Sequence, residues 1–220
     1  MSQTSTNPAL KWILIVIAVM TAIGAVAVVL LAYYPAGEYR AAKELQARGF
    51  IVEHVSPDDN WNWKYSTYVL GDGQSITSDD SRFICQLSRL HHLEFVRCDM
   101  SGLNLDEIGN CRELDFLAVS GATQFPVSEL KKLTACPIRA ISVVSKDVPL
   151  NDSDLEEFTK FTNLVTISLK FNNAGITDAC LEYFEKIPTL KYLILKESSL
   201  TQEGIEEFTK KRPDVEVYYE

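Results

Sequence analysis

Apolar residues recur in a fixed pattern along the C-terminal two thirds of the chain. The phrase LxxLxL, with mostly polar or small residues at x, has a degenerate copy at Val215 and five clear copies that start at Leu93, Leu114, Ile138, Leu164 and Leu190. Successive copies start 21 to 26 residues apart, a period typical of repeat architectures. The alternation within each copy predicts a short strand with its apolar side chains on one face.

A second pattern follows these strands. A polar dipeptide precedes an apolar pair spaced three residues apart in four places: Ile84 with Leu87, Leu155 with Phe158, Leu181 with Phe184, and Ile205 with Phe208. This spacing predicts a helix that covers the strand, with Asp152 and Asp178 as N-caps of two of the helices. One strand and one helix cannot bury a core alone, so we expect the units to stack into a parallel sheet.

The segment from Ile176 to Phe208, ITDACLEYFEKIPTLKYLILKESSLTQEGIEEF, resembles the ribonuclease-inhibitor-like or cysteine-containing subclass of leucine-rich-repeat proteins, which includes membrane-anchored bacterial members. The resemblance implies an α/β solenoid of about six units over residues 76–220, with parallel strands on the concave face and helices on the convex face. Members of this group chiefly bind other proteins. The chain lacks an F-box, so a role as a ubiquitin-ligase adaptor is not implied.

The N-terminal segment has a different character. After a tail of residues 1–11, residues 12–34 are uncharged and apolar, and they are long enough to cross a hydrocarbon layer of about 30 Å. Trp12 and Tyr34 mark the two interfaces. We therefore expect an uncleaved, single-pass transmembrane helix; a cleaved signal peptide is the alternative, but its apolar region would be shorter.

Two properties of this span stay open. The bases Arg40, Lys43 and Arg48 after the span favour a cytoplasmic C-terminal domain. The short N-terminal tail instead suits a signal anchor, and we expect an extracytoplasmic domain. The small residues Ala18 and Ala22 would permit weak self-association of the span.

Residues 36–75 are predicted to form an N-terminal cap of one helix and one hairpin. The helix ends at Gly49 and the hairpin has a turn near Pro57. The hairpin is rich in aromatic residues, which either cover the end of the core or form a ligand patch: Trp61, Trp63, Tyr65 and Tyr68.

Charge and chemistry narrow the function. The net charge is −9, and all 30 acidic residues follow residue 35, so nucleic acid is not an expected partner. His91 and His92 lie between a helix and the strand that begins at Leu93, where successive side chains point apart, so joint metal binding is not expected. The five cysteines lack metal-ligand spacing. Cys111 and Cys136 precede consecutive strands, so a disulfide between them is conceivable.

We expect no cofactor, no metal and no catalysis; the alternatives are a cysteine-dependent hydrolase or redox enzyme, and a purely structural envelope protein.

The predicted binding surface is the concave face, where the x positions of LxxLxL point outward. Aromatic side chains at its two ends would anchor a protein partner of unknown identity, with small polar and basic side chains between them. The candidate residues are Phe95, Arg97, Phe116, Ser142, Thr166, Ser168, Lys170, Tyr192, Ile194 and Lys196.

Overall fold

A computed structural model describes residues 36–55, 66–145, 151–171, 175–196 and 199–219. The chain divides into two compact units, Met1–Arg40 and Ala41–Glu220. The predicted transmembrane segment, residues 12–34, lies outside the described residues, as do Trp61, Trp63 and Tyr65. Within the described ranges, no helix has both the length and the apolar character needed to span a bilayer.

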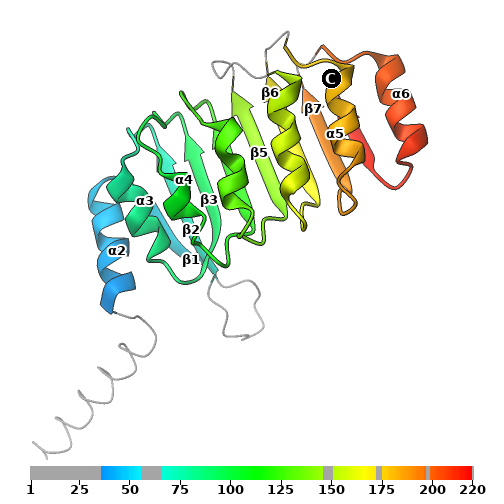
Figure 1. The fold of residues 1–220 in the computed structure, drawn as a ribbon. Coiled ribbons are helices and arrows are strands. Elements are labelled where there is room, and N and C mark those ends of the chain that lie inside the picture. Colours follow the sequence, from blue (N-terminus) through cyan, green and yellow to red (C-terminus); the bar gives the residue numbers. More distant parts are fainter. Residues whose placement is uncertain (1–35, 56–65, 146–150, 172–174, 197–198, 220) are drawn as a thin grey trace, which may run out of the picture. The chain divides into compact units, whose positions relative to one another are not determined.

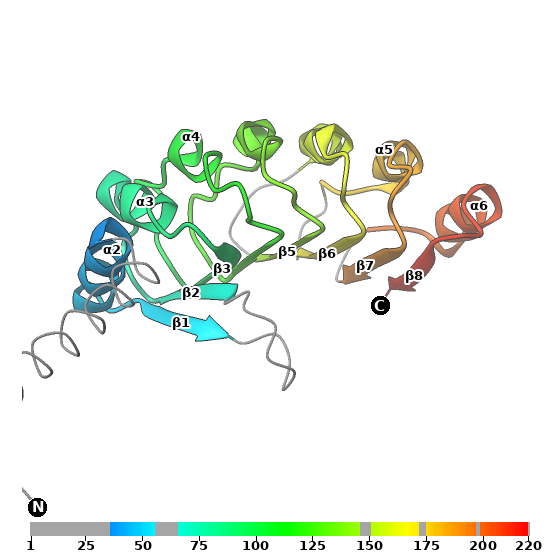
Figure 2. The ribbon, with the colours of Figure 1, turned by 90° about the horizontal axis from the view of Figure 1, so that it is seen from below.

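The described part of the second unit is one eight-stranded sheet with its strands in chain order, β1 to β8. β1 and β2 pair antiparallel, and every later pair is parallel. The helices that connect the parallel strands lie over one face of the sheet (Figures 1 and 2). This arrangement, with one strand and one short helix per repeat, is a leucine-rich-repeat solenoid, as predicted.

The strands are β1 (Ile51–Val55), β2 (Ser66–Asp72), β3 (Leu90–Val96), β4 (Phe116–Ser120), β5 (Ala140–Ser145), β6 (Thr166–Phe171), β7 (Tyr192–Lys196) and β8 (Glu216–Tyr219). The helices are α2 (Ala36–Ala47), α3 (Ser78–Cys85), α4 (Leu105–Ile108), α5 (Leu181–Glu185) and α6 (Gln202–Lys211), with 3₁₀ helices η1 (Val127–Leu133), η2 (Asp152–Lys160) and η3 (Asp178–Cys180).

A ladder of apolar side chains runs across the sheet beneath the helices. One row of this ladder contains Val69, Leu93, Leu117, Ile141, Ile167 and Leu193, and each of these residues pairs with the next one on the adjacent strand. All six are buried. Full burial of each such side chain stabilises the fold by about 1.5–3 kcal/mol, so the ladder explains why the apolar spacing is kept from unit to unit.

The register corrects the predicted frame of the first repeat. Leu93 pairs with Leu117, although the sequence pattern had matched it with Leu114. The first copy of LxxLxL therefore begins three residues earlier, at Leu90, and Phe95 occupies its last apolar position with 0% of its surface exposed. Residues 93 and 95 share a face because side chains alternate along a strand.

The helix caps also differ from the prediction. Asn151 and Thr177, not the aspartates that follow them, cap η2 and η3. Each aspartate instead reaches the next repeat. The Asp152 carboxylate accepts hydrogen bonds from the backbone N–H and the hydroxyl of Thr177 at 2.8 and 2.7 Å. Asp178 binds Thr201 in the same way, at 2.8 and 2.6 Å.

These carboxylates therefore connect consecutive repeats at the start of their helices. The Asp178 contact also constrains the helix of the following repeat. At Gly204, in the first turn of α6, an added Cβ would lie 2.4 Å from Cγ of Asp178. Glycine is consequently the residue that leaves room for the Asp178 carboxylate.

Candidate protein-binding face of the sheet

The face of the sheet opposite the helices, called the open face below, carries three rows of side chains that cross neighbouring strands. The first row is Tyr68, His92, Phe116, Ala140, Thr166, Tyr192 and Glu216; the second is Leu70, Glu94, Ala118, Ser142, Ser168, Ile194 and Tyr218; the third is Asp72, Val96, Ser120, Val144, Lys170 and Lys196. Strand alternation points all of them away from the apolar ladder.

Eight of the ten predicted residues lie in these rows. They are Phe116, Ser142, Thr166, Ser168, Lys170, Tyr192, Ile194 and Lys196. The other two predictions are wrong in their placement. Phe95 is buried in the core, and Arg97 lies just after β3 with a φ of 53°. Both errors follow from the shifted frame of the first repeat, because His92 and Glu94 take the positions expected for Phe95 and Arg97.

Arg97 nevertheless has a defined contact at this edge. Its guanidinium donates to the Asp72 carboxylate, with Nη2 2.6 Å from both oxygens and Nε 3.0 Å from one of them. This ion pair joins the end of β3 to the end of β2. Both side chains of the pair are exposed. The hydrogen bond to Asp72, followed by the negative charge of Asp72, raises the pKa of Arg97.

Three aromatic rings in contact, with His92 in the middle, occupy the N-terminal end of the open face. The ring of His92 lies parallel to that of Phe116, with centroids 4.1 Å apart, and edge-on to that of Tyr68 at 4.6 Å. The Tyr68 hydroxyl donates to Glu94 Oε2 at 2.9 Å. Burial, followed by the hydrogen bond to Glu94, raises the pKa of Tyr68 to about 12.

His92 is held mainly in its neutral form. Burial lowers the pKa of His92 and outweighs the opposing effect of Glu94. The Nε2 atom lies 3.5 Å from Glu94 Oε2 and makes no hydrogen bond within the described structure. A contact of this length is a poor hydrogen bond.

The C-terminal end of the open face has a different surface. Tyr192 and Tyr218 are 42% and 53% exposed, whereas the rings of the N-terminal end pack against each other. The Tyr218 hydroxyl donates to Glu216 Oε2 at 2.7 Å, which raises the pKa of Tyr218. Small side chains separate the two ends, namely Ala118, Ala140, Ser142, Thr166 and Ser168.

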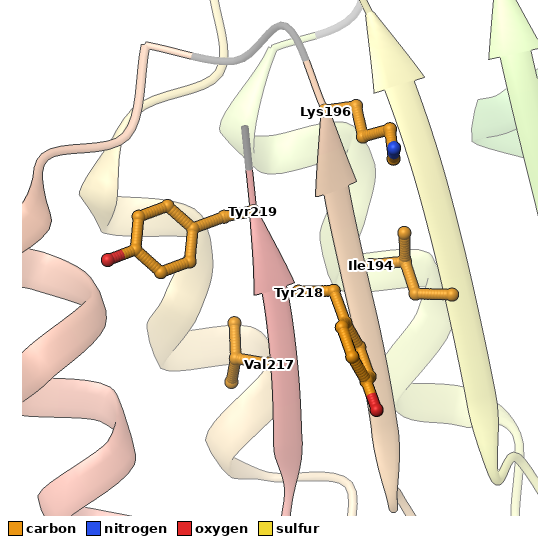
Figure 3. A pocket seen from close by; sticks show the side chains of 5 residues that line it. All are labelled: Ile194, Lys196, Val217, Tyr218 and Tyr219. Carbon is orange, nitrogen blue, oxygen red and sulfur yellow. The ribbon is translucent and has the colours of Figure 1, made fainter.

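A hollow of about 510 Å³ lies beside Tyr218 and is lined by Ile194, Lys196, Val217, Tyr218 and Tyr219. Figure 3 shows Tyr218 and Ile194 on one side of β8 and Val217 and Tyr219 on the other. The hollow therefore includes the edge of the sheet. Aromatic rings with hydroxyl ends beside small polar residues are the composition that adaptable protein-binding surfaces use.

The structure contains no disulfide between Cys111 and Cys136. Cys111 and Cys136 are both free and buried, and the sulfur atom 2.9 Å from Cys111 Sγ belongs to Cys85. Burial raises the pKa of Cys98, that of Cys136 to about 11 and that of Cys180 to about 12. These three thiols stay protonated at neutral pH, and a protonated thiol is a poor nucleophile.

The adjacent histidines separate as expected. His91 Nδ1 donates to the Arg89 carbonyl oxygen at 2.8 Å, while His92 stacks between two rings. Among the residues that the structure describes, no three His, Cys, Asp or Glu side chains are grouped so that they could hold a metal ion.

Comparison with known proteins gave similarity to solved structures only. A leucine-rich-repeat protein of Leptospira interrogans is 21% identical over 62% of this chain and 33% of that chain, with a TM-score of 0.44. An internalin C2 of Listeria monocytogenes is 17% identical over 68% and 69%, with a TM-score of 0.45. Another internalin of Listeria monocytogenes is 12% identical over 67% and 54%, with a TM-score of 0.36.

No protein-family model and no curated protein matches the chain. The chain spans about a third of the length of the Leptospira protein and about half of the second internalin. These similarities are weak, and the fold assignment rests on the repeat geometry of the chain itself.

The residues of the open face that sequence reasoning missed include His92, Glu94 and Tyr218. The signal for the first two was present, since Leu90, Leu93 and Phe95 also fit LxxLxL and place the first copy 24 residues before Leu114. Tyr218 belongs to the degenerate last copy. Its position becomes clear only through its pairing with Ile194.

Proposed function

We propose that the chain binds a protein partner on the open face of its sheet, centred on β6 to β8. The observation that carries the proposal is a pair of exposed tyrosines that both neighbour Ile194. Tyr192 lies two residues before Ile194 on β7, and Tyr218 lies opposite Ile194 on β8. Tyrosine rings bury a large apolar area on binding with little loss of side-chain entropy, and they are frequent binding hot spots.

The remainder of the open face suits a supporting role. Ser168 and Thr166 present small polar groups beside the tyrosines, which can pair with backbone groups of a partner. The stacked rings of Tyr68, His92 and Phe116 already contact each other and have less surface to offer. We therefore place the strongest contacts at the C-terminal end.

Catalysis forms no part of the proposal. A cysteine-dependent enzyme would need a thiolate near a base, and the raised thiol pKa values of Cys136 and Cys180 count against it. No cofactor is proposed. A purely structural envelope role is the remaining alternative, and the following experiment distinguishes it from partner binding.

A photo-crosslinking amino acid at position 192 tests the proposal in the full-length protein within its native cells. We expect one defined adduct with a second protein, and loss of that adduct when Tyr218→Asp is added. The matched control places the same crosslinker at Lys210, an exposed position on α6. Equal adducts at both positions, or none at position 192, would refute binding at the open face.

We further propose that residues 12–34 anchor the protein in a membrane as a single-pass helix and that it acts as an accessory subunit of a membrane complex. The support is the uninterrupted apolar sequence between Trp12 and Tyr34. The domain is proposed to be extracytoplasmic, and Ala18 and Ala22 to permit weak self-association of the span.

Fractionation tests the anchor separately from binding. The protein should stay with membranes after alkaline carbonate extraction, and protease added outside intact cells should degrade the repeats. Release by carbonate would refute the anchor, and protection from the protease would refute the orientation. Neither result depends on the open face.

A further inference from the structure

Cys85 and Cys111 lie in adjacent repeats with their sulfur atoms almost in bonding range. Cys85 is the last residue of α3, and Cys111 follows α4. The two Sγ atoms are 2.9 Å apart, so a disulfide of about 2.05 Å requires them to approach by less than about 1 Å.

The hydrogen bonds around the pair give each sulfur a distinct role. The Cys85 thiol donates to the Glu107 carbonyl oxygen at 2.6 Å, and a thiol has only one proton to donate. The Cys111 thiol therefore donates to Cys85 Sγ. This hydrogen bond, followed by burial, raises the pKa of Cys111. Cys85 is only half-buried, which makes it the sulfur that a reagent reaches first.

The position of Cys85 within its repeat explains why it faces the neighbouring repeat. Cys85 follows the buried Ile84, as Gly109 follows Ile108 in the next unit. A Cβ at Gly109 would lie 2.3 Å from the carbonyl oxygen of Lys132, which again belongs to the following repeat. A side chain at this position thus projects towards the next unit.

The third cysteine of this region is engaged elsewhere. Cys136 occupies the same position in its repeat as Cys111 does in the preceding one. The backbone N–H of Cys111 donates to the carbonyl oxygen of Ile108, and that of Cys136 to the carbonyl oxygen of Leu133, both at 2.9 Å. Cys136 Sγ lies 3.6 Å from the carbonyl oxygens of Ile108 and Gly109. Its thiol is therefore directed to backbone.

We propose that Cys85 and Cys111 are an oxidisable dithiol that closes to an intramolecular disulfide when a disulfide-type oxidant reaches Cys85. Cys85 first loses its proton to solvent; its thiolate attacks one sulfur of the oxidant, breaks the S–S bond and releases one thiolate, which takes up the proton of Cys111 and leaves as the first thiol. The Cys111 thiolate then attacks Cys85 Sγ and displaces a second thiolate, which takes up a proton from solvent and leaves as the second thiol. Two cysteine thiols lose two protons and two electrons, and the oxidant becomes two thiols.

The cross-link would join two adjacent repeats through residues that lie 26 positions apart in the sequence. Such a closure removes conformations from the unfolded chain. We expect the oxidised protein to melt about 5–10 °C above the reduced one. This inference is independent of the proposed binding function.

Thiol counting on the full-length chain in mild detergent tests the proposal. The protein is incubated with oxidised or reduced glutathione, denatured, and labelled with a maleimide that retards it on a gel. The five cysteines should all label after reduction, and three should label after oxidation. Mass spectrometry of the non-reduced digest should identify the Cys85–Cys111 peptide pair.

Two variants sharpen the result. Cys85→Ser should keep all its remaining thiols under oxidation and lose the rise in melting temperature, whereas the matched control Cys136→Ala should still lose two. A Cys111–Cys136 link, a cross-linked dimer through Cys85, a stable glutathione adduct on Cys85, or five unchanged thiols in the wild type would each overturn the proposal. The number of thiols labelled in the wild-type protein tests the proposal even where a variant fails to fold.

Discussion

Gly204→Ala tests the carboxylate contacts that connect consecutive repeats. In a helix, alanine in place of glycine would ordinarily stabilise by about 0.5–1 kcal/mol. Here the new methyl would lie 2.4 Å from Cγ of Asp178, so the carboxylate must move away from Thr201. Two hydrogen bonds to a charged group, at 2.8 and 2.6 Å, would then be lost or weakened.

The net effect can be estimated from these two contributions. Hydrogen bonds to charged groups contribute about 1.5–3 kcal/mol when buried; because Asp178 is partly exposed, we take about 1–1.5 kcal/mol for each. Gly204→Ala should therefore lower the free energy of unfolding by about 1–2 kcal/mol, or Tm by about 3–6 °C.

A double-mutant cycle decides the cause. Asp178→Ala alone should destabilise by about 2–3 kcal/mol, and adding Gly204→Ala to it should be neutral or stabilising, because the clash is gone. Denaturant unfolding followed by circular dichroism measures all four proteins. The same loss from Gly204→Ala in both backgrounds would refute the reasoning.

Two further predictions concern the first repeat. Phe95→Ala should lower the free energy of unfolding by about 3–5 kcal/mol because it empties a core position. Phe116→Ala, on the open face, should lower it by only about 1–2 kcal/mol. Denaturant titrations measure both, and equal losses would contradict the corrected register. Because burial lowers the pKa of folded His92 below its usual 6.5, the unfolded chain binds a proton more readily, and stability should fall as pH decreases through about 6.5. His92→Gln should flatten this part of the profile measured by thermal melts, and a profile with the wild-type slope would assign the loss to other groups.

The architecture could be predicted from the sequence because the leucine spacing is itself the core. Leu117, Ile141, Ile167 and Leu193 must share one face of the sheet, and only a stack of similar units buries them all. The frame of the first repeat was harder. Leu90, Leu93 and Val96 are all apolar and spaced by three, so two frames fit, and burial of Phe95 selects between them.

The candidate site depended on this choice. A shift of three residues reverses which side chains of a strand face the core. The frame that starts at Leu93 therefore predicts Phe95 and Arg97 on the open face, where the structure has His92 and Glu94. Later strands have one clear frame, which is why Thr166, Ser168 and Tyr192 were placed on the correct face.

Local sequence patterns do not predict the side-chain contacts between neighbouring repeats. The sequence indicated polar residues at the helix starts, but whether Asp178 caps its own helix or binds Thr201 depends on the distance between neighbouring units. The cysteines show the same limit. Spacing before the strands suggested Cys111 and Cys136, whereas the side-chain direction at the end of α3 brings Cys85 to Cys111.

The sequence by itself determined the repeat, its period and the existence of an outward face, because the hydrophobic effect acts on the spacing of apolar residues along the chain. Only the tertiary structure decided which atoms of neighbouring repeats meet. Those contacts depend on the rise and rotation from one unit to the next, which no single repeat encodes. The stacked rings at His92, the exposed tyrosines of β7 and β8, the carboxylate contacts and the Cys85–Cys111 pair all belong to this second class.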